Sequence, residues 1–303
     1  MPFMHVWQPV LFYAKSSLPT PKQETIHPKN TFQKMVFSLS RVDEKSTVRE
    51  TKATAYAMKI VFSIIKWALA LFFSSTILAV VAYRFIPVYI TPLMVIRCVE
   101  QVADGHMPTC HHSWTSLDNI SPHLPVAVMA SEDQRFLLHH GFDFDAIEKA
   151  AKRNSKGGKR KLGASTISQQ TAKNAFLWPG RSWTRKGFEV YFTALIELMW
   201  SKQRIMEVYL NSIEMGDGIY GASAVAEYHF GKTASELTRS ECALVAATLP
   251  NPRKFDSSAP SAYMRKRQSK IEHEMRFMPS FPREGEDINP DTAAGGVYSK
   301  RKK

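Results

Sequence analysis

A run of 24 residues near the N-terminal end, IVFSIIKWALALFFSSTILAVVAY at residues 60–83, constrains this chain more than any other feature. It is apolar apart from Lys66 and four hydroxyl side chains. A helix of this length extends about 36 Å, which exceeds the roughly 30 Å hydrocarbon core of a bilayer. Lys66 lies near one end, where its long stem can carry the ammonium group to the interface. We expect one transmembrane helix over residues 58–84. It should be retained in the mature protein, because VVAYRF is a poor signal-peptidase site.

The basic residues that flank this run predict its orientation. Those before it are Arg41, Lys45, Arg49, Lys52 and Lys59, whereas Arg84 and Arg97 follow it. Positive charge is enriched on the cytoplasmic side of membrane helices. Asp43, Glu44 and Glu50 reduce the bias but do not reverse it. The flanks therefore predict a cytoplasmic N-terminus and a large body on the outer side.

The remaining chain divides into three further parts. Residues 1–57 are polar and irregular, which predicts a disordered cytoplasmic leader, or translation begun upstream of a true start at Met35 or Met58. Residues 85–278 form the main domain, and residues 279–303 form a flexible basic tail that ends in SKRKK. The apolar segment 84–96 is broken by prolines. Either it belongs to the core of the domain, or it rests on the membrane surface.

The net charge predicts an anionic partner. The 303 residues carry a formal charge of +13. Residues 149–204 contain thirteen Lys and Arg against only Glu189 and Glu197, so most of the excess lies in this window. Such a field suits nucleic acid, a phospholipid surface or a phosphorylated substrate. No nucleic-acid-binding motif is present, and we therefore expect no nucleic-acid partner.

The three cysteines do not predict a metal site. Cys98, Cys110 and Cys242 have neither CxxC nor zinc-ligand spacing. Cys98 and Cys110 either pair outside the cell or remain two unpaired small apolar residues.

From Ser121 onward the sequence patterns are helical. Thr166 with Gln169, and Thr238 with Glu241, have the spacing of capping boxes. Residues 182–200 carry an apolar stripe at three- and four-residue steps. We found no convincing alternating strand, so the expected fold class is all-α.

The stretch MASEDQRFLLHHGFD at residues 129–143 places two acids, Glu132 and Asp133, in a basic chain. They mark either a solvated helix end or an acid/base site. The stretch GASTISQQTAKNAF follows at 163–176, where hydroxyls, amides and free backbone N–H groups at a helix start suit phosphate or sugar oxygens. The stretches RSWTRKGFE (181–189) and SKQRIMEVYLN (201–211) add cations near further helix starts.

Taken in this order, and followed by GIYGASAVAEYHFGK and LPNPRKFDSSAPSAYMRKRQ, these motifs closely resemble the peptidoglycan glycosyltransferases of glycosyltransferase family 51. The resemblance covers about residues 90–275, and the absence of a transpeptidase domain after it is typical of the monofunctional biosynthetic members. It implies a lysozyme-like helical domain with a smaller membrane-proximal jaw lobe. It also implies the bacterial inner membrane as the location, with the catalytic domain on the periplasmic side. The implied substrates are lipid II and the growing glycan strand, and cell-wall synthases or division-complex proteins are possible partners.

The resemblance also implies roles for individual residues. Glu132 matches the general base and Glu189 the second essential acid. Positions around the substrate's pyrophosphate are matched by Lys173, Arg181, Arg185, Lys186 and Lys202. Further substrate contacts are expected from Asp133, Arg135, Phe136, Ser165, Thr166, Gln169, Gln170 and Asn174. No cofactor is required, although a divalent ion, Mg²⁺ or Mn²⁺, near Glu189 remains an alternative.

Elementary chemistry fits this assignment. A sugar hydroxyl is a poor nucleophile at neutral pH and needs a carboxylate base within hydrogen-bond reach. A departing diphosphate needs fixed cations rather than an acid, which accounts for the basic window. A lysozyme-like hydrolase or lytic transglycosylase, and a non-catalytic membrane-anchored scaffold that binds the cell wall, are the alternatives. The hydrolase needs no cationic cradle of this kind, and the intact catalytic motifs argue against the scaffold.

Overall fold

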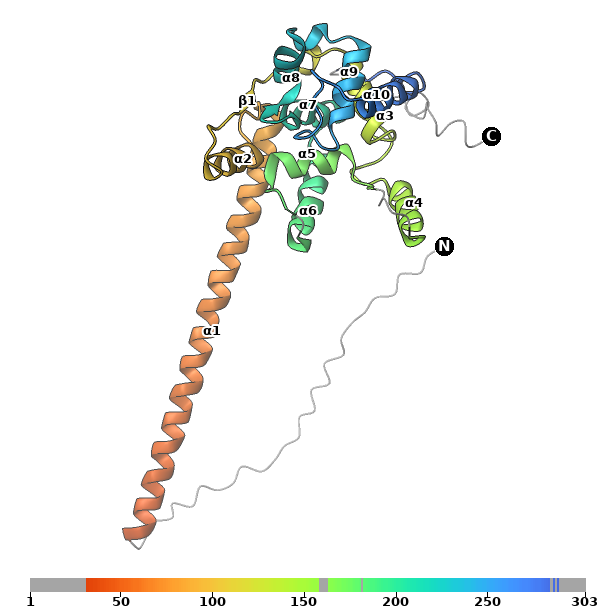
Figure 1. Ribbon diagram of the computed structural model, residues 1–303. Helices are drawn as coiled ribbons and strands as arrows, with labels where there is room; N and C mark the ends of the chain where they lie inside the picture. The colour runs from red at the N-terminus through yellow and green to blue at the C-terminus, as the bar shows by residue number, and fades with distance from the viewer. Residues whose placement is uncertain (1–30, 158–162, 181, 284–285, 287, 289–303) are drawn as a thin grey trace, which may run out of the picture. The chain divides into compact units, whose positions relative to one another are not determined.

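The computed structural model describes residues 31–157, 163–180, 182–283, 286 and 288, and it separates the chain into two compact units, residues 1–70 and 71–303. The first element is the long helix α1, Thr31–Phe85 (Figure 1). The expected disordered leader is therefore wrong for residues 31–57, which are helical, while residues 1–30 lie outside the described part. The reason is visible in the sequence: residues 31–85 contain neither proline nor glycine, the two residues that interrupt helices most strongly.

One part of α1 can cross a membrane. Arg49–Phe85 is long and apolar enough, and within the described residues it is the single helix that meets this test. Few of its residues are buried. This agrees with the expectation of one membrane helix, and the length and composition of the span support an anchored protein.

The second unit, called the body below, is almost entirely helical (Figure 1). Its α-helices are α2 (Pro92–Ala103), α3 (His123–Glu132), α4 (Phe144–Ser155), α5 (Ile167–Phe176), α6 (Trp183–Met199), α7 (Lys202–Ser212), α8 (Gly221–Phe230), α9 (Arg239–Thr248) and α10 (Ala262–Met275). Two short 3-10 helices, η1 (Leu117–Asn119) and η2 (Ala234–Glu236), connect them. The expected all-α, lysozyme-like class is confirmed.

A small sheet was not expected. Its strands are β1 (His111–His112), β2 (Glu214–Gly216) and β3 (Ile219–Tyr220), in the order β1-β3-β2. β3 runs parallel to β1 and antiparallel to β2. Strands of two or three residues are too short to show an alternating pattern, which is why the sequence did not reveal them.

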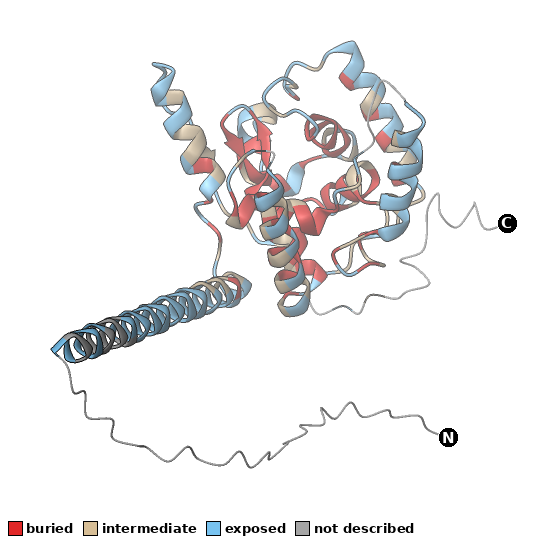
Figure 2. Cartoon of the chain, turned by 90° about the horizontal axis from the view of Figure 1, so that it is seen from below, coloured by how far each residue is buried: buried red, intermediate tan, exposed pale blue. Residues whose placement is uncertain are grey.

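The core of the body is built around α5, which packs against α6 and α7, while α3, α9 and α10 pack together beside it. The buried residues gather at the centre of the body in Figure 2. Both predicted capping boxes are present, at Thr166 with Gln169 and at Thr238 with Glu241. Ser182 and Ser201 cap α6 and α7 with their side chains. These caps fix the starts of the helices that carry most of the predicted site residues.

The last turns of α1 belong to the body. Val80 is fully buried, and its carbonyl accepts a hydrogen bond of 2.8 Å from the indole N–H of Trp200. The guanidinium of Arg204 donates to the carbonyl of Tyr83, with an Nη2–O distance of 2.7 Å. The compact body therefore begins at Leu71 rather than at the expected residue 85.

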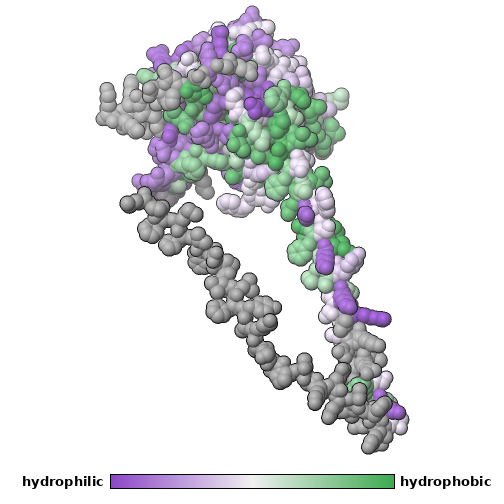
Figure 3. All heavy atoms as spheres, turned by 180° about the vertical axis from the view of Figure 1, so that it is seen from behind, coloured by the Kyte–Doolittle hydropathy of each residue, from purple (hydrophilic) through white to green (hydrophobic). Residues whose placement is uncertain are grey.

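The apolar segment after α1 is divided between the core and the surface of the body. Val88 and Met94 are buried in the body. Other apolar side chains on this segment and on α2 remain exposed, namely Ile86, Tyr89, Ile90, Val95, Val99 and Val102. Figure 3 shows a large area of apolar surface on one face of the body. Exposed apolar patches of this kind mark interaction surfaces.

Candidate functional site

Glu132 is the last residue of α3 and stays partly exposed. Its Oε1 accepts a hydrogen bond of 3.1 Å from Ser131, and its Oε2 accepts one of 3.2 Å from Nε2 of Gln170 on α5. The nearest cation is Arg267 on α10, whose Nη2 lies 3.6 Å from Oε1. These contacts orient the carboxylate, but none is a short ion pair. Glu132 is thus held in place and remains open to accept a proton.

Glu189 lies one turn into α6 and is buried. Its Oε2 accepts a hydrogen bond of 2.8 Å from Nη1 of Arg185, and its Oε1 is bonded to Nζ of Lys186. Arg185 is buried as well, so this is not a surface salt bridge. Removal of either partner would leave an uncompensated buried charge.

Lys173 on α5 connects the two acids. Burial lowers the pKa of its ammonium group, and the charges of Arg185 and Lys186 lower it further. The carboxylates of Glu189 and Glu132 both act in the opposite direction. Within the described residues, Lys173 forms no ion pair. It is therefore a desolvated cation, placed among the predicted site residues, whose charge is free to meet a ligand.

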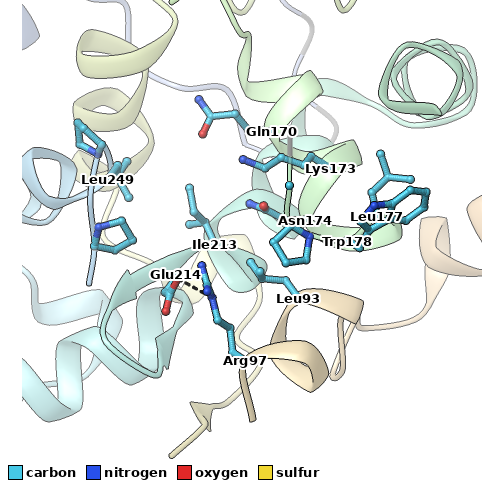
Figure 4. Close-up of a pocket in the computed structure, with 14 residues that line it drawn as sticks. Leu93, Arg97, Gln170, Lys173, Asn174, Leu177, Trp178, Ile213, Glu214 and Leu249 are labelled. Atoms are coloured by element: carbon cyan, nitrogen blue, oxygen red, sulfur yellow. Dashed lines mark ion pairs between the residues drawn. The ribbon is translucent and has the colours of Figure 1, made fainter. Parts of the chain in front are cut away.

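A cavity of ≈ 290 Å³ opens next to Lys173. Figure 4 shows Gln170, Lys173 and Asn174 of α5 directed into it, with Leu249 across from them. Arg97 of α2 and Glu214 of β2 form another part of the wall, and their side chains are 3.9 Å apart. Burial raises the pKa of the Glu214 carboxyl, an effect that Arg97 partly offsets. Cations and amides thus line a cavity that also has apolar walls, a suitable surface for a ligand with phosphate and sugar oxygens.

Behind Glu132, a buried network holds the ends of α3 and α5 together. Asp133 accepts a 3.0 Å bond from the backbone N–H of Ile167, and Nε2 of His139 lies 2.9 Å from its Oδ2. The hydroxyl of Thr166 donates to the carbonyl of Gly141 at 2.7 Å. Gly141 has a φ of +84°, and a Cβ there would lie 2.9 Å from Cγ2 of Thr193, so only glycine fits. His139 therefore helps to hold this loop through its contact with Asp133.

This network changes the roles of several predicted residues. Asp133, Thr166 and Gln169 are buried, and their side chains bond within the network or the capping box. Phe136 is wholly buried in the core. The prediction that these four residues touch substrate gains no support from such burial. They instead fix the positions of Glu132 and of the start of α5.

Lys202 also lies elsewhere than expected. Its ammonium group bonds both carboxylate oxygens of Glu197, at 2.8 and 3.0 Å, and lies 4.5 Å from the centre of the Phe136 ring. Glu197 in turn accepts a bond from Ser168. Burial lowers the pKa of Lys202, an effect that Glu197 opposes. Its charge is already matched by Glu197, so the structure gives no support to the predicted contact with the diphosphate.

The remaining predicted residues fall into three groups: those at or near the cavity, one bonded at the start of α4, and one outside the described part of the chain. Gln170, Lys173 and Asn174 reach the cavity, and Ser165 is exposed just before α5. Arg135 bonds Asp143 and Asp145, which ties it to the start of α4. Arg181 lies outside the described residues. Glu132 contacts α5 through Gln170, whereas Glu189 is bonded to Arg185 and Lys186 on its own helix. Neither acid is among the residues that line the cavity.

Sequence reasoning missed three residues near the site. Arg267, next to Glu132, lies in the quoted motif YMRKRQ but received no role. Arg97 and Glu214 were not singled out, although both line the cavity. The signal that could have found Glu214 is an acid in the motif SIEMGDG, directly before a glycine-containing turn.

The donor groups at Glu189 do not fit a resident divalent ion. Both oxygens of this carboxylate already bond cations, and no cluster of three or more His, Cys, Asp or Glu side chains occurs in the part of the chain that the structure describes. Mg²⁺ requires several oxygen ligands in octahedral geometry. A metal placed here would meet Arg185 and Lys186, and no step of the chemistry below passes through one.

Comparisons with known proteins agree with this geometry. The family model described as Transglycosylase matches residues 101–276. A biosynthetic peptidoglycan transglycosylase of Bacteroides thetaiotaomicron is 67% identical over 71% of this chain and 86% of its own length. Proteins of the same description from Bdellovibrio bacteriovorus and Xanthomonas campestris are 52% and 51% identical, over 72% and 70% of this chain and 87% of their own lengths in both cases.

The matched region contains Glu132, Lys173 and Glu189 and extends through α10, so the site described above lies within the part of the chain that the family model covers. By the extent of this match and the identity of its relatives, the chain belongs to the transglycosylase family.

Proposed function

We propose that this protein polymerises peptidoglycan glycan strands as an inverting glycosyltransferase that uses lipid II. One observation carries the proposal: Lys173 lines the cavity as a largely desolvated cation and has no ion partner among the described residues. Glu189 is already neutralised by two cations, whereas Glu132 is not. The two acids therefore have different tasks.

In the proposed step, the 4-hydroxyl of an acceptor lipid II attacks C1 of the lipid-linked end of the growing strand. Glu132 takes the hydroxyl proton as the new C1–O bond forms. The bond between C1 and the phosphate oxygen breaks, and its electron pair leaves with the diphosphate. Attack opposite to the leaving group inverts the configuration at C1.

The leaving diphosphate needs fixed positive charge more than it needs a proton. Lys173 supplies a point charge, and Lys186 is the more exposed of the two cations on α6. Arg185 is held by Glu189, which keeps its guanidinium in one position. We assign Glu189 the task of ordering these cations. This preorganised field distinguishes the site from that of a lysozyme-like hydrolase, whose neutral glycan leaves no diphosphate.

The membrane anchor and the apolar surface fit the same substrate. A polyprenyl tail leaves the bilayer only at a cost of about 0.8 kcal/mol per CH₂ group, so its enzyme has to work at the membrane. The flanking charges of the span support a cytoplasmic N-terminus and a body on the periplasmic side of the bacterial inner membrane. The exposed apolar side chains on residues 86–102 would then rest against lipid.

The test is to incubate the detergent-solubilised full-length protein with labelled lipid II, and separately with finished glycan strands. We expect glycan polymer and free polyprenyl diphosphate from lipid II, and no cleavage of finished strands. Release of fragments from strands without polymerisation would favour a hydrolase or lytic transglycosylase. Binding of glycan with neither activity would favour a scaffold.

A chelator arm tests the role of divalent ions. Because the donor set at Glu189 does not fit a metal, we expect polymerisation to continue after chelation. Loss of activity that only Mg²⁺ or Mn²⁺ restores would show that the reaction requires a divalent ion and would contradict this expectation. Cell-wall synthases and division-complex proteins remain proposed partners, to be sought by cross-linking in intact cells.

A further inference from the structure

Cys98 and Cys110 lie at the two ends of one surface segment of the body. Cys98 is on α2, and Cys110 directly precedes β1. The connecting loop folds back onto the helix: the backbone N–H of Thr109 donates to Oε1 of Gln101 at 2.7 Å. The next strand begins at once, since His111 N–H donates to the carbonyl of Gly218 at 2.8 Å. These two attachments place Cys110 beside the face of α2 that carries Cys98.

The packing around the loop is close. Gly218 has a φ of +69°, and a Cβ there would lie 2.7 Å from the carbonyl oxygen of Thr109. The residue before Cys110 is therefore held between α2 and the turn that joins β2 to β3. The two thiols are close enough that Cys98 helps to raise the pKa of the Cys110 thiol. Both are free thiols in this structure.

We propose that Cys98 and Cys110 form a structural disulfide that fastens α2 to the loop before β1. The proposal rests on the topology given under the proposed function, which places the body in an oxidising compartment. The two thiols lose two protons and two electrons as the S–S bond forms. A disulfide of an oxidoreductase accepts them and is reduced to two thiols.

Cys98 is partly buried and Cys110 is exposed, so an oxidoreductase can reach the pair. Partial burial, together with the neighbouring Cys98, raises the pKa of the Cys110 thiol to about 11. Cys242 cannot compete for either partner. It is buried on α9, bonds the carbonyl of Leu237, and burial raises the pKa of its thiol to about 12.

The position of the bond gives it a consequence for the site. Arg97, the residue before Cys98, lines the cavity that contains Lys173 and pairs with Glu214. Thus the disulfide would hold one wall of the cavity against the sheet that carries Glu214. This makes it a means of positioning α2, not a part of the reaction.

The first experiment detects the bond directly in full-length protein taken from membranes with free thiols blocked. Cleavage after Arg97 and Glu100 separates Cys98 from Cys110, so the two peptides stay joined only through a disulfide. We expect a joined pair that separates on reduction, with Cys242 alkylated only after denaturation. Free thiols at both positions would overturn the inference.

Labelling with a membrane-impermeant maleimide separates the two possible reasons for such a failure. If intact spheroplasts label Cys98 and Cys110, the body is outside and only the disulfide is wrong. If labelling requires lysis, the topology is wrong as well. Polymerisation of lipid II is assayed in parallel. It tests the proposed function separately from the disulfide and from the topology.

Thermal unfolding gives a second measurement. We expect C98S, C110S and the double variant to unfold at the same lower temperature, about 5–10 °C below the oxidised protein. A reducing agent should lower the midpoint of the wild type by this amount and leave the double variant unchanged. Additive losses in the two single variants, with no effect of reductant, would contradict a shared bond.

Discussion

Glu132 and Glu189 lie in contrasting surroundings. Glu189 is buried and bonded to Arg185 and Lys186, while Glu132 is partly exposed and receives two neutral hydrogen bonds and one long ion pair of 3.6 Å. A carboxylate whose oxygens are both occupied by cations cannot easily take a proton. This contrast supports the proposal that Glu132 acts as the base and that Glu189 orders the cations.

The replacement Glu132→Gln removes the carboxylate that is not neutralised by cations. Of the changes considered, it should lower the polymerisation rate most. An amide cannot accept the hydroxyl proton, and a positioned base contributes about 10²–10⁴-fold. We expect a loss of this size in the polymerisation of lipid II, measured by product separation. Stability should change by less than about 1 kcal/mol, because the only ion pair lost is long and partly exposed.

Glu148→Gln provides the matched control. Glu148 is an exposed acid on α4 that pairs with Lys152, and its loss should leave both rate and stability unchanged. Polymerisation at the wild-type rate by the Glu132→Gln protein would remove Glu132 from the mechanism.

The replacement Glu189→Gln removes the buried carboxylate that is neutralised by two cations. Its main effect should be a lower free energy of unfolding. It leaves the buried guanidinium of Arg185 without its counter-charge, a change that typically costs about 3–5 kcal/mol. Chemical denaturation measures this loss. The rate should also fall, though less than in Glu132→Gln, because the cations lose their order while the base remains. Equal stability of the two variants would show that the buried pair is not formed.

The titration of Lys173 predicts how polymerisation and stability depend on pH. Burial lowers its pKa from the ordinary 10.5, so its cation is lost at a lower pH than that of an exposed lysine. Polymerisation should therefore fall as pH rises through the lowered value. In the window between this value and 10.5 the unfolded chain binds more protons, so the free energy of unfolding should rise with pH. Activity and stability then change in opposite directions.

The variant Lys173→Arg keeps the charge to a higher pH. We expect the alkaline limb of kcat/KM for lipid II to move upward, whereas Lys152→Arg on the exposed face of α4 should not move it. An unchanged alkaline limb in Lys173→Arg would show that another group titrates there.

Much of the fold followed from local sequence rules. The capping boxes at Thr166 and Thr238 and the apolar stripe of α6 depend on short-range spacing, and each is present. The helix over residues 31–57 was missed because polarity was taken as a sign of disorder, although no residue there interrupts a helix. The packing of Val80 against Trp200 was out of reach, because it joins parts of the chain that are far apart in sequence.

The site was predictable to a different degree. Motif order identified Glu132, Glu189 and the cations, but it could not tell which cations are free. Lys173 and Lys202 both follow helix starts in the sequence, yet Glu197 neutralises only Lys202. That distinction depends on the distance between side chains on different elements, which spacing alone does not encode. Arg267 was missed for the same reason.

Arg267 provides the test with the smallest expected effect, because among the described residues it is the cation within ion-pair distance of Glu132. Its Nη2 donates to Ser131 at 3.0 Å and lies 3.6 Å from Glu132, so it orients the base without occupying it. A partly exposed pair is worth about 0–1 kcal/mol, which predicts at most about a fivefold fall in kcat for Arg267→Gln, with KM for lipid II unchanged. Arg267→Lys should recover part of this loss, and Arg265→Gln on the exposed side of α10 should cost nothing. A loss in Arg267→Gln as large as that in Glu132→Gln would mean that the base depends on this cation, and the contrast between an open and a neutralised acid would no longer hold.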